Sequence, residues 1–337
     1  MTMKHTWNLG LAAVFAVAAV AGCGGTYPAG NSSTTPTATA GTPAAPAGDK
    51  EIEDSGMDIR RAALPFRILR ASGGAEITPD AFFEELAAAD SVCLGESHKN
   101  PHHHWAQLRM FEELVNRLEA SKMALGMEMF QRPFQGVLND YGAGKIDERA
   151  MLTRTDWANR WGYDFALYRP LMALAVKQEI PILALNISTE FKEKIKRVGI
   201  EGLTEKERAR APEVNVDDPD HKAWFDDLMG GGAHSSSHGG GHASQEDDEK
   251  ARRFYFVQVL WDETMAETAS SWLTAEAGRR MVVIAGSGHC HESAVVRRMK
   301  RRGVKKVLSV RPVLESGAAQ ELADPQTDYL FVLISPQ

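Results

Sequence analysis

The sequence predicts an α/β protein with a mostly parallel sheet flanked by helices. Short apolar runs of strand length alternate with longer stretches in which apolar residues recur at helical spacing. Polar and titratable residues directly follow several of these runs, at the edge where open α/β sheets bind ligands. The 337 residues are 43% apolar and 25% charged, which is enough for a sizeable core.

The amino terminus is predicted to be a targeting segment. A short basic start precedes an apolar stretch, residues 9–20, that is too short to span a bilayer comfortably and ends in small residues. Residues 20–23, VAGC, resemble the lipobox of bacterial lipoproteins. The resemblance implies a signal peptide over residues 1–23, a lipid on Cys23 and, because Gly24 is not Asp, an outer-membrane location. A plain signal peptide cut near Ala21 is the alternative.

Residues 24–58 are rich in Ala, Pro, Thr, Ser and Gly and are predicted to be a flexible tether to the membrane. The folded domain is then expected over residues 59–337. With Cys23 lipidated, Cys93 and Cys290 remain, and an oxidising compartment would allow a disulfide that their spacing alone does not require.

The elements of the domain follow from its periodicity. Residues 59–70 are an amphipathic lead-in, and residues 188–249 are mainly loops because the periodicity weakens there, with a flexible His-rich insertion near residues 230–250. Strands are predicted over residues 91–95, 123–129, 180–186, 281–286, 307–310 and 329–334. Helices are predicted over residues 79–88, 101–120, 134–141, 147–152, 254–277 and 292–301.

The first strand leads into the clearest site signal, SVCLGESHKNPHHH at residues 91–104. Glu96 and His98 occupy a strand-to-helix turn, because Pro101 suits the first turn of the next helix. His103 lies in that first turn. Glu and His beside a Gly turn are costly to bury without a charge or metal to satisfy them, so we favour a functional site over a polar loop that is merely rich in His.

Later strands end in similar residues. Glu128 stands at the end of the second strand, although it could instead cap the next helix, and His289 follows a Gly-rich turn after the fourth. Neighbouring parallel strands end at one edge of a sheet, so these side chains are expected to meet there. The residues predicted at this edge are Glu96, His98, His103, Glu128, Asn186, His289 and Arg311. The predicted ligands of a divalent metal among them are Glu96, His98, His103, Glu128 and His289.

The segment WANRWGYDFALYRP, residues 157–170, gathers two Trp and two Tyr beside two Arg. Such a cluster is usually core or lid packing. It also suits a flat aromatic ligand, and a tyrosine phenolate is a known axial ligand of ferric haem.

Six motifs carry a resemblance to a known family. In order along residues 60–335 they are LGESHKNPHHHWAQ, ALGMEMFQRPFQ, WANRWGYDFALYRP, IPILALNIS, LWDETMA and VVIAGSGHCHE. They resemble the ChaN-like bacterial lipoproteins, described as haem-binding and linked to iron uptake. The resemblance implies a small helical subdomain, haem held on a surface by a Tyr ligand, and a homodimer around it. Tyr163 and Tyr168 are the motif tyrosines, and His103 and Arg169 suit the haem propionates. The His-rich insertion departs from the family pattern.

We therefore expect a membrane-anchored lipoprotein that binds haem for iron acquisition. The ChaN-like fold is also similar to erythromycin esterase and Tiki-type hydrolases, which implies an alternative, a metal-dependent hydrolase with Glu96, His98, Glu128 and His289 as catalytic residues. An envelope scaffold that keeps the polar edge for stability is a third hypothesis. The net charge of −7 makes nucleic acid an unlikely partner, and the basic run at residues 297–306 is predicted to be a solvated helix face.

Overall fold

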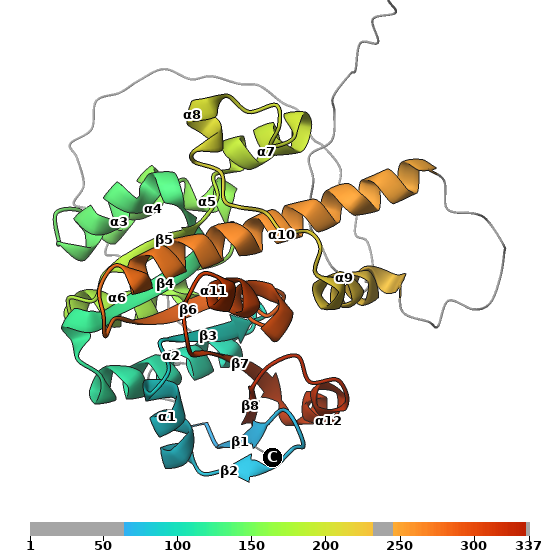
Figure 1. Cartoon of the computed structure of the whole chain (residues 1–337). Coiled ribbons are helices and arrows are strands. Elements are labelled where there is room, and N and C mark those ends of the chain that lie inside the picture. Colours follow the sequence, from blue (N-terminus) through green and yellow to red (C-terminus); the bar gives the residue numbers. More distant parts are fainter. Residues whose placement is uncertain (1–63, 232–244, 335–337) are drawn as a thin grey trace, which may run out of the picture. The chain divides into compact units, whose positions relative to one another are not determined.

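The computed structural model describes residues 64–231 and 245–334 (Figure 1). The predicted signal peptide, lipobox and tether, and most of the His-rich insertion, lie outside these ranges. Within them, no helix is long and apolar enough to cross a membrane.

One eight-stranded sheet forms the core of the domain, in the order β2-β1-β8-β7-β3-β6-β4-β5. The six strands from β8 to β5 run parallel, and β1 and β2 add an antiparallel edge. The predicted fold class is therefore confirmed. The strands are β1 (Phe66–Arg70), β2 (Glu76–Ile77), β3 (Ser91–Glu96), β4 (Met123–Gln131), β5 (Ile182–Asn186), β6 (Arg280–Gly286), β7 (Val307–Leu314) and β8 (Tyr329–Leu333).

Helices cover both faces of this sheet (Figure 1). One face packs mainly on α1, α2 and α6, and the other on α10 and α11, with strand residues alternating between the two cores. The helices are α1 (Pro79–Ala87), α2 (Pro101–Arg117), α3 (Gln135–Gly142), α4 (Glu148–Arg154), α5 (Trp157–Arg160), α6 (Arg169–Lys177), α7 (Thr189–Val198), α8 (Glu205–Arg208), α9 (Pro219–Asp226), α10 (Gln245–Thr274), α11 (Arg297–Arg301) and α12 (Glu315–Ala323).

Three predictions about elements were wrong. Residues 66–70 of the lead-in form β1, whose partner β8 lies at the other end of the domain and is invisible to local periodicity. The region predicted as loops contains α7, α8 and α9, each too short for a clear period but capped by Ser188, Thr204 and Asp218. Residues 245–250, assigned to the flexible insertion, begin α10.

The helical subdomain is built on a small cluster of its own. Ile195 of α7 and Leu203 pack against Leu260 of α10 and against Ile187, which follows β5. α7 and α8 are thus held to the sheet through α10.

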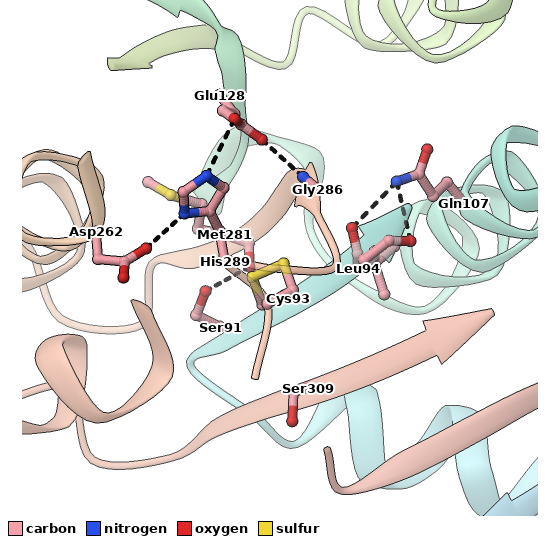
Figure 2. Close-up of a disulfide and its surroundings, with 12 residues drawn as sticks. Ser91, Cys93, Leu94, Gln107, Glu128, Asp262, Met281, Gly286, His289 and Ser309 are labelled. Carbon is pink, nitrogen blue, oxygen red and sulfur yellow. Dashed lines mark hydrogen bonds and ion pairs between the residues drawn. A yellow bond between two sulfur atoms is a disulfide. The ribbon is translucent and has the colours of Figure 1, made fainter. Parts of the chain in front are cut away.

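Strand β3 sits between β7 and β6 and is buried along its whole length. Its last residue, Glu96, pairs in register with Gly286, the last residue of β6. A disulfide joins Cys93 of β3 to Cys290 in the turn after β6, with 5.3 Å between the two Cα atoms (Figure 2). The chain-entropy treatment of so long a loop gives a stabilisation of about 5 kcal/mol. The turn after β6 is thereby fixed beside the end of β3.

Candidate functional site

Glu96 is the buried centre of the site. Its Oε1 accepts hydrogen bonds from the Tyr168 hydroxyl at 2.8 Å and from Nδ1 of His98 at 2.7 Å. Its Oε2 lies 3.0 Å from Nδ1 of His104 in the first turn of α2. Three donors from two segments therefore satisfy a carboxylate that solvent does not reach.

His98 joins this centre to the aromatic segment 157–170. Its side chain is 28% exposed, and its ring packs at 4.7 Å from the Trp161 ring and 4.8 Å from the Tyr163 ring. Burial opposes protonation of His98, but the carboxylates of Glu96 and Glu128 outweigh it and raise its pKa. Since Nδ1 donates to Glu96, Nε2 is the ring nitrogen left for another partner.

Gly286 is the point over which His98 and Glu128 meet. A Cβ atom at Gly286 would lie 2.9 Å from Cε1 and 3.3 Å from Nε2 of His98, and 3.6 Å from Oε2 of Glu128. The absence of a side chain at residue 286 therefore makes room for the His98 ring. The same Oε2 accepts a hydrogen bond of 2.6 Å from the Gly286 amide.

A second imidazole reaches Glu128 from the turn after β6 (Figure 2). Nε2 of His289 lies 3.4 Å from Oε1 of Glu128, and Nδ1 of His289 lies 2.6 Å from Oδ1 of Asp262. Burial opposes protonation of His289, but Glu128 and Asp262 raise its pKa. The pKa of Asp262 is low because His289 and His221 outweigh its burial. The strand-tip cluster is thus Glu96, His98, Glu128, His289 and Asp262.

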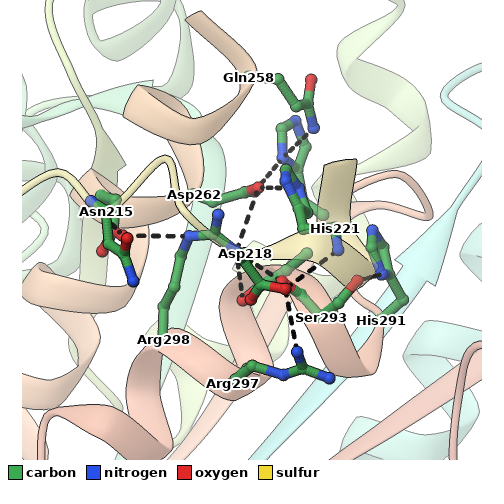
Figure 3. A network of polar contacts seen from close by, with 12 residues as sticks. Asn215, Asp218, His221, Gln258, Asp262, His291, Ser293, Arg297 and Arg298 are labelled. Carbon is green, nitrogen blue, oxygen red and sulfur yellow. Dashed lines mark hydrogen bonds and ion pairs between the residues drawn. The ribbon is translucent and has the colours of Figure 1, made fainter. Parts of the chain in front are cut away.

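Asp262 also faces a network behind the cluster (Figure 3). Its Oδ2 lies 3.0 Å from Nε2 of His221 on α9 and 3.9 Å from Nη1 of Arg298 on α11. Next to it, Glu263 pairs with Arg298 at 3.3 Å and with Arg302 at 2.7 Å. The basic run predicted as a solvated face therefore turns part of its charge inward, because two buried carboxylates of α10 require it.

The structure brings together four of the residues predicted at the sheet edge, Glu96, His98, Glu128 and His289. The other three are engaged elsewhere. Nδ1 of His103 accepts from the Ser97 amide at 3.0 Å, and burial lowers its pKa to about 4. Oδ1 of Asn186 accepts from the next amide in the chain, that of Ile187. Arg311 lies within β7, which is longer than predicted, and pairs with Glu321 at 2.9 Å.

The predicted divalent-metal site is not supported. Within residues 64–231 and 245–334, no three His, Cys, Asp or Glu side chains form a group that could hold a metal ion. The expected ligands, Glu96, His98, His103, Glu128 and His289, instead bond to one another, to Asp262 or to backbone amides.

Two of the predicted haem contacts are committed to the protein itself. Tyr168 is fully buried, and its hydroxyl donates to Glu96 and accepts from Nε1 of Trp161 at 3.2 Å. Burial and the Glu96 carboxylate raise its pKa, so Tyr168 is unsuited to act as a phenolate ligand. Arg169 holds both oxygens of Glu148, at 2.8 and 2.9 Å. Both predictions are corrected accordingly.

Tyr163 is differently placed. It is partly exposed, and its carbonyl accepts a 2.7 Å hydrogen bond from Nε1 of Trp157, which holds the backbone. Within the described residues its hydroxyl has no hydrogen-bond partner. Its ring adjoins those of His98 and Trp161, and the Lys99 ammonium lies 5.9 Å from its centroid. A phenol beside an indole and an imidazole, all three partly exposed, is a donor set that fits haem.

The fold and this donor set define an α/β protein with an aromatic ligand site at the carboxyl edge of a parallel sheet. Residues 82–299 match the family described as "Haem-binding uptake, Tiki superfamily, ChaN", and the chain belongs to this family. The resemblance inferred from the six motifs is confirmed. No curated protein sequence matches the chain.

Solved structures show the same fold. A structure of cofacial haem binding to ChaN of Campylobacter jejuni is 18% identical, with a TM-score of 0.61 over 80% of this chain and 96% of that one. More distant are the type III effector HopBA1 (12% identity, TM-score 0.42, 82% and 100% coverage) and the erythromycin esterase EreC (10%, 0.40, 80% and 83%). At such identities the similarity concerns the fold alone.

Proposed function

We propose that this chain binds haem through Tyr163 and serves in haem or iron acquisition. The observation that carries the proposal is the free hydroxyl of Tyr163 in a chain of the haem-binding uptake family. Haem supplies a ferric iron that a phenolate oxygen can coordinate. The exposed faces of His98 and Trp161 provide flat contact surface beside it.

The buried residues hold this surface in place. Trp161 donates to Tyr168, and Tyr168 and His98 both donate to Glu96. The aromatic segment is therefore tied to the end of β3 by one continuous chain of hydrogen bonds, which pre-organises the ligand surface.

Membrane attachment is part of the proposal. The VAGC sequence supports lipidation of Cys23, with the tether of residues 24–58 and an outer-membrane address. The disulfide between Cys93 and Cys290 suits an oxidising envelope compartment. Mass spectrometry of the membrane-extracted protein should find acyl chains on Cys23, and Cys23→Ser should release the protein from membranes.

Haem held face to face, as in Campylobacter jejuni ChaN, would require two copies of the chain. We therefore include a haem-bound homodimer in the proposal. Sedimentation with and without haemin measures it directly, and a monomer at saturating haemin would exclude it.

A haemin titration of the protein without its signal peptide tests the binding proposal. We expect a shifted Soret band and the charge-transfer absorption of a tyrosinate ligand, both lost in Tyr163→Phe. Tyr141→Phe is the matched control, because Tyr141 is also a partly exposed tyrosine but lies on α3. A Soret shift that survives Tyr163→Phe would exclude Tyr163 as the ligand.

Acid–base hydrolysis is a second candidate, favoured by two imidazoles that each carry a carboxylate. Nε2 of His98 could take a proton from water beside Glu128, with Glu96 fixing the ring. We expect any ester or peptide hydrolysis to be lost in His98→Asn and retained in Tyr163→Phe. No turnover across such substrates would remove this candidate.

A further inference from the structure

Lys99 is the cation nearest the candidate haem ligand in sequence and in contact. Its side chain is exposed, and its ammonium lies over the Tyr163 ring, 5.9 Å from the centroid. Its backbone is fixed on both sides. His98 before it is held by Glu96, and Asn100 after it caps α2 by accepting from the His102 amide at 3.0 Å.

The other cations of this neighbourhood are already paired. Arg169 is bound by Glu148, and Arg160 pairs with Glu190 at 2.5 Å. In the described part of the chain, no carboxylate lies within ion-pair distance of Lys99. Lys99 is therefore an unpaired positive charge beside an unpaired phenol, in a protein whose net charge is −7.

We propose that Lys99 binds a propionate of haem and so selects porphyrins that carry free carboxylates. This inference rests on the proposed function. Haem is an apolar plate with two carboxylates at one edge, and a protein of net negative charge repels them unless a local cation offsets that repulsion. The residues predicted for this role, His103 and Arg169, are engaged with Ser97 and Glu148. Lys99 has the charge, the exposure and the place beside Tyr163.

The experiment compares haemin with its dimethyl ester, in which both propionates are neutral. At low ionic strength, Lys99→Gln should weaken haemin binding about fivefold, as expected for a part-exposed ion pair. It should leave the affinity for the dimethyl ester and the position of the Soret band unchanged, because Tyr163 remains. Lys99→Arg should bind haemin as the wild type does.

Lys222→Gln is the matched control. Lys222 also lies over a tyrosine ring, 5.5 Å from the centroid of Tyr255, but it is paired with Asp226 on α9. We expect its haemin affinity to equal that of the wild type. A similar loss in this variant would mean that general charge, not a contact at Lys99, was measured.

Failure of the inference is distinct from failure of the proposed function. If Lys99→Gln binds haemin as tightly as the wild type, or weakens haemin and the dimethyl ester equally, Lys99 does not bind a propionate although Tyr163 can still be the ligand. If the wild type shows no Soret shift, haem binding and the role of Lys99 are both overturned.

Discussion

The strand-tip cluster contains two imidazole–carboxylate pairs that look alike in bond geometry but differ in their surroundings. Nδ1 of His98 lies 2.7 Å from Glu96, and Nδ1 of His289 lies 2.6 Å from Asp262. The carboxylate of the first pair is two residues away on the same turn, whereas that of the second comes from α10, 27 residues earlier in the chain.

The difference lies on the outer side of each ring. The side chain of His98 is 28% exposed and adjoins Trp161 and Tyr163, while that of His289 is 11% exposed and precedes the disulfide cysteine Cys290. The His289 pair therefore fixes the turn after β6, and the His98 pair presents one face to a ligand. Similar hydrogen bonds serve architecture in one place and recognition in the other.

Removing the shared carboxylate of the buried pair should have the largest effect. Asp262→Ala leaves His289, His221 and Arg298 buried without their counter-charge, so the free energy of unfolding should fall by about 3–5 kcal/mol. His98→Ala should cost only about 1 kcal/mol, because Glu96 keeps two donors. Urea unfolding of both variants measures the contrast, and equal losses would contradict the division of roles.

Filling the space over Gly286 should disturb the exposed pair selectively. In Gly286→Ala the new methyl group collides with the His98 ring, and we expect a loss of about 1–3 kcal/mol together with weaker haem binding. Gly136→Ala on α3 is the control, because its Cβ meets no atom within 4 Å and should stabilise the helix slightly. Unchanged haem affinity in Gly286→Ala would show that His98 does not contact the ligand.

Opposite pH dependences within one turn provide the finest test. Burial opposes protonation of His289, but Glu128 and Asp262 raise its pKa to about 9, so its contribution is full below pH 6.5 and is lost as the pH rises toward 9. Burial lowers the pKa of His291 to about 3, so its contribution is full above pH 6.5 and is lost as the pH falls toward 3. Each slope is at most about 1.4 kcal/mol per pH unit.

Urea unfolding across this pH range separates the two. His289→Asn should flatten the alkaline limb of the stability curve, and His291→Asn the acidic limb. If His289→Asn leaves the alkaline limb as steep as in the wild type, the imidazolium at residue 289 is not what stabilises the turn.

Residues that end buried strands were the predictable part of the site. Glu96, His98, Glu128 and His289 could be found because each follows an apolar run, and parallel strands bring such positions to one edge. Asp262 could not, because it lies in the middle of a long helix and its partners come from α9, α11 and the turn after β6. Its position in the LWDETMA motif was the available signal.

The two tyrosines of the aromatic segment show a second limit. Tyr163 and Tyr168 stand in the same motif, and nothing local distinguishes them. Only the packed structure shows that Tyr168 is buried against Glu96 while Tyr163 is partly exposed. The strands β1 and β2 and the short helices α7 to α9 were missed for the same reason, because pairing and packing across the domain define them.

The bond from Tyr168 to Glu96 has a consequence for protein engineering. The fourteen residues from Trp157 to Pro170 cannot be transplanted as an independent loop, because their anchor is a carboxylate buried at the end of a different strand. A graft onto another scaffold must therefore carry an acidic group at the matching depth, with His104 or an equivalent donor behind it.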